Sequence, residues 1–570
     1  MAGFIKKVRI GDVLIREGVI SEKRLHEALE LQKQKPKGTL IGETLIELGY
    51  VTEEKMAESL QKHLQIEYVD LRKVNVDEKA VRLVTEPIAR KHRLIPFAFS
   101  EKDPNRLRVA MTDPQDFMAL DDLAILTNMV IEPCISTSTQ INAQIDRFFG
   151  KQQANAIAEQ YKKEQETFSD EEDTEEGRKA DVENSPIVLL VKNLIEQAAR
   201  QRASDIHIEP FETFVRVRYR VDGVLREVIT YDKALFSAII ARIKIISGMD
   251  ISEKRKPQDG RITIDVDHRE YDIRVSNLPT VYGEKVVMRL ASKEGFNKQK
   301  SELGLRPEDL VKFDAILKNP NGIILVTGPT GSGKSTTLYT ALSELSTEEV
   351  NIVTVEDPVE ANVNGVNQVQ VNNKADMTFA SALRSILRQD PDIIMIGEIR
   401  DGETAEIAVR ASITGHLVVS TLHTNSTAAT VGRLIDMGIE PYLLGDSLVG
   451  IIAQRLVRRL CDCKKPKEAT PDEKRMLSRS EAERLTIYEP KGCQFCNGSG
   501  YVGRIGIYEI MTITQTIRNL IAEGATPDRI KKAAEAEGMS SLRASAAKYV
   551  CEGVTSMAEL IKVTYSADEC

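Results

Sequence analysis

The sequence contains no long apolar run and few cysteines, and each absence excludes a class of protein. No stretch of about 18 uncharged apolar residues occurs, so we expect no membrane-spanning helix. Charges follow the first few residues, where a secretion signal would be apolar, so we expect no such signal. Seven cysteines in 570 residues do not make a disulfide scaffold, and they fit the reducing environment of the cytoplasm.

Basic residues are also too few for a protein whose main ligand is nucleic acid. The chain has 77 lysines and arginines against 86 aspartates and glutamates, which gives a net charge of -9. Phosphate backbones require a basic surface, so we predict no nucleic-acid partner. A chain of this length is too long for one hydrophobic core, and about three or four domains are expected.

A glycine-rich segment carries the clearest chemistry in the sequence. Residues 328–335 lie between an apolar run at 323–327 and a helical pattern that begins near Lys334. This pattern binds nucleotide phosphates, because glycines let backbone N–H groups face the phosphate oxygens and the helix dipole adds positive potential. We predict that a nucleoside triphosphate and Mg²⁺, the latter on the Ser335 hydroxyl, are bound by Gly328, Pro329, Thr330, Gly331, Ser332, Gly333, Lys334, Ser335 and Thr336.

Three predicted strands downstream each end in a side chain that fits hydrolysis of the bound nucleotide. Strands at 351–355, 392–396 and 417–421 are followed by Glu356, Glu398 and His423. In an open parallel sheet, ligands bind beyond the carboxyl ends of the strands, so these side chains should converge near the phosphates. A carboxylate there can orient or deprotonate the attacking water. Acids at strand ends also serve as loop caps, which is the alternative for each one alone.

The N-terminal part begins with an internal repeat. Residues 10–18 (IGDVLIREG) return as 41–49 (IGETLIELG), and each copy predicts two short helices with a glycine at the turn. Residues 65–150 predict a small α/β unit with strands at 94–99 and 107–111 and a helix at 120–127. Residues 164–176 contain eight acids and no base, which predicts a solvated linker.

A second α/β unit follows the linker. A helix is predicted at 186–202 and strands at 215–220, 261–266 and 271–275. Alternation in 215–220 places three arginines on one face of the strand, as in a surface strand or in one that presents cations to a neighbouring subunit's phosphates. The polar segment 291–302 predicts a hinge, and the alternating pattern from Leu303 onward predicts a parallel sheet with helices on both faces.

Four cysteines have the spacing of metal ligands. They form the pairs C-x-C and C-x-x-C, and the second pair precedes a glycine-rich turn. Four thiolates at such a spacing suit a closed tetrahedral zinc site, with free thiols or a redox pair as alternatives. The predicted ligands are Cys461, Cys463, Cys493 and Cys496.

In this order, the segments 328–335, 355–358, 396–405 and 415–425 resemble the Walker A, Asp, Walker B and His boxes of the type II/type IV secretion ATPase family. The PilB-type assembly (extension) ATPases of type IV pili are the most similar group. The resemblance implies an α/β multidomain chain with a RecA-like P-loop ATPase core and a tetracysteine zinc-binding insertion. It implies an MshE-type domain at 1–150, a linker at 151–183, a PAS-like α/β domain at 184–295 and the ATPase domain at 296–570.

The same resemblance implies roles for single residues. Glu398 becomes the catalytic glutamate, Glu356 assists it, and His423 senses the γ-phosphate, with His416 as the weaker candidate. A buried, hydrogen-bonded structural histidine is the alternative for His416. Gly397 stands where many other P-loop ATPases have a magnesium-binding aspartate, so the second Mg²⁺ ligand stays open. The family forms hexamers with ATP between subunits, and the arginines expected to reach its phosphates are Arg274, as first choice, and Arg218, Arg220 and Arg289.

The N-terminal repeat resembles the cyclic-di-GMP motif of MshE-type domains. The expected ligand residues are Arg9, Gly11, Gly18, Gly42 and Gly49. The second half departs from the family pattern, because His63 replaces the closing glutamine and the spacer between the halves is longer. The alternative is a helical docking module in which the glycines only form turns.

The family resemblance also implies partners and a location. We expect a cytoplasmic homo-hexamer that is peripheral to the inner membrane through a PilC-type platform protein and cytoplasmic alignment proteins of the pilus machine. A type II secretion ATPase that drives pseudopilus assembly and protein export is the nearest alternative. Alternatives of another kind are a cyclic-di-GMP-responsive regulator with a weak ATPase and, disfavoured by the net charge, a nucleic-acid translocase.

Overall fold

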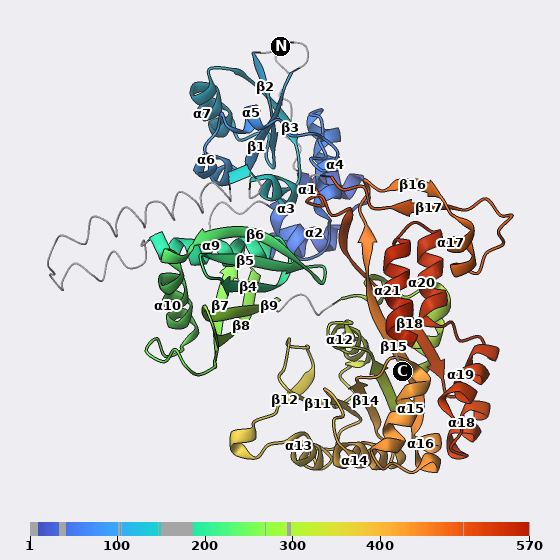
Figure 1. Ribbon diagram of the computed structural model, residues 1–570. Coiled ribbons are helices and arrows are strands. Elements are labelled where there is room, and N and C mark those ends of the chain that lie inside the picture. Colours follow the sequence, from blue (N-terminus) through green and yellow to red (C-terminus); the bar gives the residue numbers. More distant parts are fainter. Residues whose placement is uncertain are drawn as a thin grey trace. The chain divides into compact units, whose positions relative to one another are not determined.

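The computed structural model (Figure 1) describes residues 10–33, 41–100, 103, 105–145, 148–149, 186–267, 269–292, 298–493 and 495–568. Arg9, the predicted linker at 151–183, residues 293–297 of the predicted hinge and Cys570 lie outside these residues. The chain divides into two compact units. One comprises residues 1–219, 225–258 and 277–287, and the other comprises residues 220–224, 259–276 and 288–570.

The repeat folds into two pairs of helices, as predicted. These are α1 (Ile10–Arg16) with α2 (Glu22–Lys33), and α3 (Ile41–Glu47) with α4 (Glu53–Leu64). Gly18 and Gly49 end the first helix of each pair with φ of +70° and +68°, a conformation that favours glycine. The two pairs share a small core built from Leu14, Ile20, Ala28, Leu45, Val51 and Met56.

The next part is a small sheet covered by short helices. Its strands are β1 (Leu94–Phe99), β2 (Arg106–Met111) and β3 (Val130–Ile135), in the order β1-β2-β3. β1 and β2 are antiparallel and β2 and β3 are parallel, and the sequence pattern did not predict β3. The helices are α5 (Glu78–Val81), α6 (Glu86–Lys91) and α7 (Phe117–Thr127).

A six-stranded sheet follows, in the order β6-β5-β4-β9-β8-β7. The strands are β4 (Ala203–Pro210), β5 (Phe214–Val221), β6 (Val224–Asp232), β7 (Gln258–Val266), β8 (Arg269–Thr280) and β9 (Gly283–Ser292). α9 (Pro186–Arg200) packs on β4 and on α10 (Phe236–Ser247), which follows the short η1 (Lys233–Leu235). The predicted alternation in β5 is confirmed, because Val215, Val217 and Tyr219 are fully buried and the arginines between them are not.

The sheet that carries the glycine-rich loop has seven strands in the order β12-β11-β13-β14-β10-β15-β18. They are β10 (Gly322–Thr327), β11 (Ile352–Glu356), β12 (Val366–Gln370), β13 (Ile393–Ile396), β14 (Leu417–Leu422), β15 (Leu448–Leu460) and β18 (Tyr501–Thr512). Six strands are parallel, as predicted. β18 is antiparallel to β15, which the local pattern did not predict.

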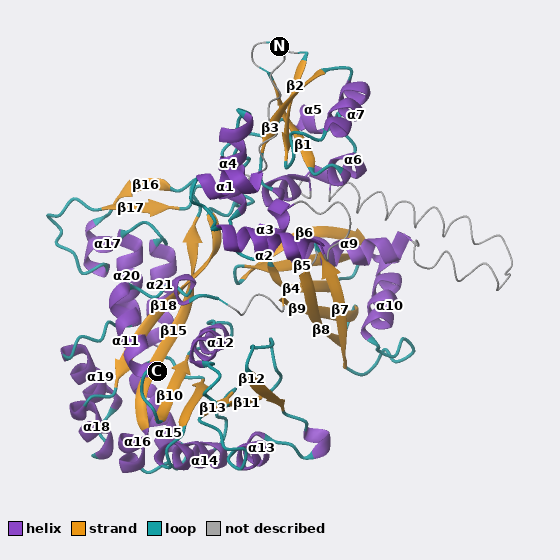
Figure 2. Cartoon of the chain, turned by 180° about the vertical axis from the view of Figure 1, so that it is seen from behind, coloured by secondary structure: helices purple, strands orange, loops and turns teal. Residues whose placement is uncertain are grey.

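Helices cover both faces of this sheet (Figure 2), as the alternation of strands and helices predicted. In β10, Ile323 and Leu325 face one core with α13 to α16, α18 and α19, while Ile324 and Val326 face the other with α11 and α12. A strand buried on both faces reads as a continuous apolar run for this reason.

The remaining elements of the C-terminal part are α11 (Pro307–Leu317), α12 (Lys334–Leu345), α13 (Phe379–Ile386), α14 (Gly402–Ile413), α15 (Thr427–Asp436), α16 (Pro441–Ser447), α17 (Pro471–Met476), α18 (Gln515–Ala522), α19 (Pro527–Ala536), α20 (Leu542–Cys551), α21 (Met557–Asp568), the hairpin β16 (Lys465–Glu468) and β17 (Thr486–Glu489), and the short η3 (Lys300–Glu302) and η4 (Asn373–Ala375). Among the described residues, no helix has the length and apolar content needed to cross a bilayer.

Candidate active site and metal centre

The glycine-rich loop joins the end of β10 to the start of α12. Gly328, Gly331 and Gly333 have φ of +151°, +79° and +90°. A Cβ atom at Gly328 would lie 2.5 Å from the carbonyl oxygen of Gln454, and one at Gly333 would lie 2.9 Å from that residue's side-chain nitrogen. The loop therefore needs glycine both for its backbone conformation and for its close approach to β15.

Lys334 lies at the first position of α12 with its side chain folded over the loop. Its Nζ donates hydrogen bonds to the carbonyl oxygens of Gly328 (2.8 Å) and Pro329 (3.2 Å). Burial lowers the pKa of Lys334 to about 8, although the carboxylate of Glu398 opposes this effect. A desolvated ammonium that is held by two neutral carbonyl groups fits a triphosphate, whose oxygens would satisfy it better.

Two side chains of β15 hold the segments on either side of the loop's ligand site, α12 and the residues after β14, and sequence reasoning missed both. The amide oxygen of Gln454 accepts a hydrogen bond from Thr337 of α12 at 2.8 Å. Arg455, only 5% exposed, donates to the backbone and side-chain oxygens of Asn425 at 3.1 and 3.0 Å. The one available signal was a Gln-Arg pair within the apolar stretch 448–457, and it did not show what the pair would contact.

Glu398 and His423 come together at the ends of two adjacent parallel strands, β13 and β14. Nε2 of His423 lies 3.2 Å from a carboxylate oxygen of Glu398, and Arg400 donates to the other oxygen. Burial alone would raise the pKa of Glu398, but Arg400 and His423 outweigh burial and lower it. This carboxylate is therefore ionised at neutral pH, as a group that accepts a proton from water must be.

Glu356, in contrast, belongs to a separate buried network. It is 4% exposed and accepts hydrogen bonds from Thr354 at 2.6 Å, from Gln368 at 3.0 Å and from the hydroxyl of Tyr339. Both carboxylate oxygens are thus occupied within the protein. The expected convergence is seen for Glu398 and His423 only, and the assisting role of Glu356 stays a prediction.

Local packing explains Gly397, and a contact with a backbone carbonyl group explains His416. A Cβ atom at Gly397 would lie 3.3 Å from the carbonyl oxygen of Val355, so a larger residue would press on β11. Nδ1 of His416 lies 2.9 Å from the carbonyl oxygen of Ala411, where α14 ends. The position of His416 thus favours its alternative role as a hydrogen-bonded structural histidine.

The predicted phosphate-binding arginines lie in the six-stranded sheet. Arg218 pairs with Glu209 at 2.7 Å, and Arg220 donates to the carbonyl oxygen of Gly223 at 3.1 Å. Arg274 and Arg289 lie on β8 and β9. Arg274 has no ion pair with any residue that the structure describes, which distinguishes it from Arg218.

The glycines of the N-terminal repeat have different surroundings. A Cβ atom at Gly11 would lie 2.8 Å from a methyl carbon of Leu25, so glycine there lets α1 pack closely on α2. A Cβ atom at Gly42 would lie 3.4 Å from Met56, which is ordinary van der Waals contact. Gly18 and Gly49, with open space around them, have the positive φ of their turns. Packing and turns therefore explain Gly11, Gly18 and Gly49 without a ligand, but do not require glycine at Gly42.

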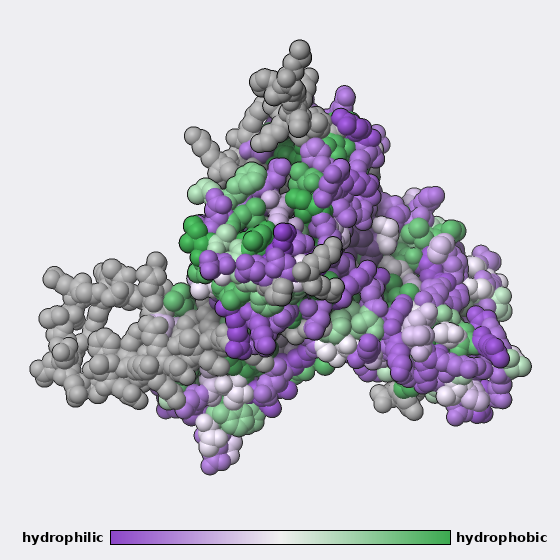
Figure 3. Space-filling model, turned by 90° about the horizontal axis from the view of Figure 1, so that it is seen from above, coloured by the Kyte–Doolittle hydropathy of each residue, from purple (hydrophilic) through white to green (hydrophobic). Residues whose placement is uncertain are grey.

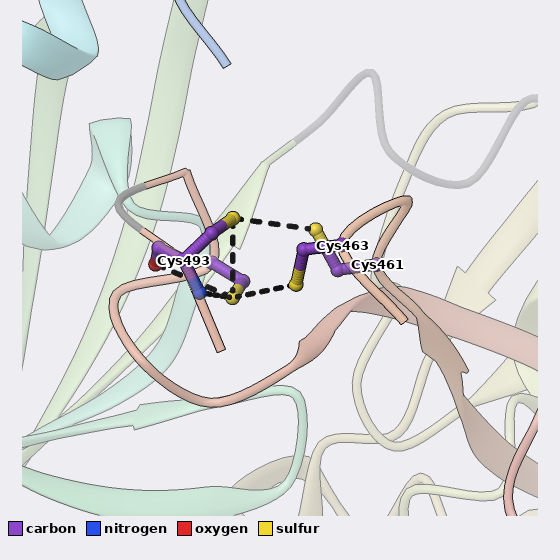
Figure 4. A group of neighbouring side chains, drawn as sticks. Cys461, Cys463 and Cys493 are labelled. Atoms are coloured by element: carbon purple, nitrogen blue, oxygen red, sulfur yellow. Dashed lines mark hydrogen bonds between the residues drawn. The ribbon is translucent and has the colours of Figure 1, made fainter. Parts of the chain in front are cut away.

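The four cysteines lie on two loops whose side chains point toward one another (Figure 4). Their sulfur atoms all lie within 4.8 Å of each other, with separations of 3.8 Å for Cys461–Cys493, 3.9 Å for Cys463–Cys496 and 3.7 Å for Cys493–Cys496. A tetrahedral metal with bonds of about 2.3 Å to sulfur spaces its ligands about 3.8 Å apart. The four thiols therefore fit one tetrahedral metal ion.

Backbone groups favour the thiolate form of Cys496, whereas burial raises the pKa of Cys461 and Cys463. The N–H groups of Cys493 and Gly500 both donate to the sulfur of Cys496 at 3.1 Å. Burial opposes ionisation, but these donors and the adjacent thiols lower the pKa of Cys496 to about 7. Metal ligands need such a deprotonated sulfur.

The fold and the site together define a class. A RecA-like sheet with a phosphate loop after β10, and with a carboxylate and a histidine paired at the ends of β13 and β14, is the core of a P-loop ATPase. The family described as "Type II/IV secretion system protein" matches residues 180–562, and the MshEN domain matches residues 64–155. The chain belongs to the type II/IV secretion ATPase family.

Relatives and solved structures agree with this assignment. The chain is 43% identical to "Type IV pilus assembly ATPase PilB" of Myxococcus xanthus, over 97% of this chain and 98% of that protein. It is 50% identical to "Type II secretion system protein HxcR" of Pseudomonas aeruginosa, over 69% of this chain and 79% of that protein. The Legionella pneumophila ATPase DotB has a similar fold, with a TM-score of 0.50, 21% identity and coverage of 66% of this chain and 96% of that one.

Nucleotide affinity should depend on pH through Lys334. In the protein without nucleotide, Lys334 has a pKa of about 8, and bound phosphates raise that pKa. The contribution of Lys334 to ATP affinity is therefore constant below about pH 8. Above that pH, the affinity falls by up to about tenfold per pH unit. Equilibrium binding of ATP between about pH 7 and pH 9.5 measures the effect. In Lys334→Arg the guanidinium stays charged, so the decline should disappear, and equal slopes in both proteins would contradict the assignment.

Proposed function

We propose that this protein is the ATPase motor that drives type IV pilus assembly. The observation that supports this proposal best is its similarity to a pilus assembly ATPase over nearly the whole of both chains, including the N-terminal part. The motor would act as a hexamer at the cytoplasmic face of the inner membrane. It would move a platform protein that adds pilins to the filament, with alignment proteins as further partners.

Within one subunit, the named residues have separable tasks. The loop amides and Lys334 hold the phosphates, and the Ser335 hydroxyl at the start of α12 would hold Mg²⁺, which neutralises charge on the phosphates. Glu398 positions the attacking water and accepts its proton, because its carboxylate is ionised and half-buried. His423 and Arg400 fix the orientation of that carboxylate through their hydrogen bonds.

The hexamer would complete each site with a neighbouring subunit's arginine. Arg274 is the best candidate, because it has no ion pair among the described residues of its own chain. Arg218 would first have to leave Glu209. Guanidinium groups act across such interfaces because their planar donors match phosphate oxygens. Arg220 and Arg289 remain further candidates.

A type II secretion ATPase is the second candidate function. The similarity to HxcR, 50% over 395 residues, is the observation that favours it. Deleting the gene and scoring both surface pili and secreted enzymes separates the two. Loss of pili with normal secretion supports pilus assembly, whereas the reverse result supports secretion.

Two further ligands belong to the proposal. Zinc is the metal that suits four thiolates in a closed tetrahedral site, where it would stabilise the segment between the two cysteine pairs. Cyclic-di-GMP would bind the N-terminal repeat, whose motif resembles that of MshE-type domains and which directly precedes the MshEN match at residues 64–155. A regulatory cyclic-di-GMP module with a weak ATPase is the alternative of another kind, and the intact Glu398–His423 pair speaks against a weak ATPase.

Removing the carboxylate of Glu398 should slow ATP hydrolysis while ATP binding remains. In Glu398→Gln the rate of ATP hydrolysis should fall by about 10²–10⁴, because the amide cannot accept a proton from water. Steady-state ATPase assays and ATP binding measure the two effects separately. The control is Glu403→Gln, an exposed residue in the first turn of α14, which should keep the parent rate. Parent-like turnover in Glu398→Gln would refute the base assignment.

Mixed hexamers test the shared site. Arg274→Ala and Glu398→Gln should each be inactive alone. When they are mixed, a Glu398→Gln subunit can supply its arginine to a neighbour that has Glu398, so activity should rise above the sum of the two proteins. Arg255→Ala, which changes a 90% exposed side chain, controls for loss of an arginine. No rescue in the mixture would show that Arg274 does not act across the interface.

Zinc content tests the metal centre. Purified protein should contain about one zinc per chain, and Cys493→Ser should lose most of it, because three thiolates hold zinc less tightly. Elemental analysis measures the metal. Cys551→Ser, a change at a cysteine outside the cluster, should keep the zinc. The proposal fails if the parent protein is stable and active without metal.

Calorimetry on the full-length protein tests cyclic-di-GMP binding. We expect heat of binding in the parent and its loss in Arg9→Ala, since arginine stacks on guanine. Arg16→Ala, which changes an exposed residue at the end of α1, should still bind. If saturating ligand gives neither heat nor a thermal shift, the repeat is a helical docking module only.

A further inference from the structure

Helix α7 is apolar on both of its faces, although only one face is covered. Ala119 and Leu123 are buried against the small sheet. The opposite face exposes Phe117 (71%), Met118 (76%) and Ile125 (82%), together with Leu126 (46%). Figure 3 shows apolar residues (green) exposed among hydrophilic ones on the face that is seen from above.

These side chains form one continuous face. Residues 117, 121 and 125 are four apart, as are 118 and 122, so all five project from the same side of the helix. Single exposed apolar residues are ordinary, but a contiguous apolar patch marks an interaction site.

The charged residues of α7 and of its two flanking segments are all of one sign. Residues 112–131 contain four aspartates, at 113, 116, 121 and 122, and no lysine, arginine or histidine. Asp116 caps α7 by accepting from the N–H of Ala119 at 3.1 Å, and His92 lies 3.1 Å from Asp116 and 3.6 Å from Asp122. Asp121 has no ion pair with any residue in the described part of the chain. The apolar face is thus crossed by carboxylates that its own surroundings only partly neutralise.

These charges decide between the possible occupants. A membrane is disfavoured, because helices that lie on anionic lipid carry lysine and arginine on their polar side. A second copy of the chain, related by a two-fold axis, would place aspartates against aspartates, and like charges repel at an interface. A partner with apolar side chains flanked by lysine or arginine satisfies both the apolar face and the carboxylates.

We propose that α7 is a docking surface for a basic amphipathic helix of another protein, which packs its apolar side on Phe117, Met118, Ile125 and Leu126 and places its cations near Asp121 and Asp122. The surface lies outside the ATPase core.

The test uses the full-length protein and a fluorescent peptide of about 14 residues made of leucine and lysine, with the leucines on one helical face. Fluorescence anisotropy measures the Kd. Phe117→Ser/Ile125→Ser should raise the Kd about tenfold or more, because central apolar side chains carry most of the binding energy. Asp121→Asn/Asp122→Asn should raise the Kd at low salt and flatten its dependence on salt.

Controls separate this surface from general stickiness. Val311→Ser removes an apolar side chain that is 70% exposed on α11 and should leave the Kd unchanged. All variants change exposed side chains, and none lies in the phosphate loop or at Glu398 or His423, so they should fold and keep the parent ATPase rate. An acidic peptide of leucine and glutamate should bind more weakly than the lysine peptide.

Three results would overturn the proposal. The first is an equal Kd for the lysine peptide in the parent and in Phe117→Ser/Ile125→Ser. The second is cosedimentation with phosphatidylglycerol vesicles that depends on these two side chains, which would assign the face to lipid. The third is concentration-dependent self-association in sedimentation velocity that Phe117→Ser/Ile125→Ser abolishes, which would assign the face to a second copy. Each result is independent of whether the motor serves pili or secretion.

Discussion

The close approach of the phosphate loop to β15 is the constraint on which the active site depends. A Cβ atom at Gly328 would lie 2.5 Å from the carbonyl oxygen of Gln454, so the loop keeps its shape only with glycine there. Gln454 and Arg455 then hold α12 and the loop after β14 in place through buried hydrogen bonds. The position of Lys334 at the start of α12 follows from this contact, because the same turn sets where the helix begins.

Two carboxylates near this loop have opposite surroundings. Glu398 is paired with an arginine and a histidine at the strand ends, so it stays ionised and oriented. Glu356 is held by a hydroxyl, an amide and a tyrosine within the protein and is almost fully buried. Only Glu398 thus has the surroundings of a group that acts on water, while Glu356 has those of one that holds β11, β12 and α12 together.

Much of the fold could be predicted from the sequence, because buried parallel strands and amphipathic helices have distinct local periodicities. The strands at 323–327, 351–355, 392–396 and 417–421 were found in this way, and a contiguous motif marked the loop. β3 and the antiparallel pairing of β18 were missed, since partner choice depends on residues far apart in the chain. The support of α12 by Gln454 was missed for the same reason, because 117 residues separate Gln454 from Thr337.

In the N-terminal repeat, the sequence also could not show whether a glycine is present for helix packing or for ligand binding. Gly11 meets Leu25, so the packing of α1 on α2 is enough to favour glycine there whether or not a ligand binds. Gly42 has room for a Cβ atom beside Met56, so its helix pair does not require glycine. In such a repeat, a glycine points to a ligand only where neither packing nor turn geometry requires it.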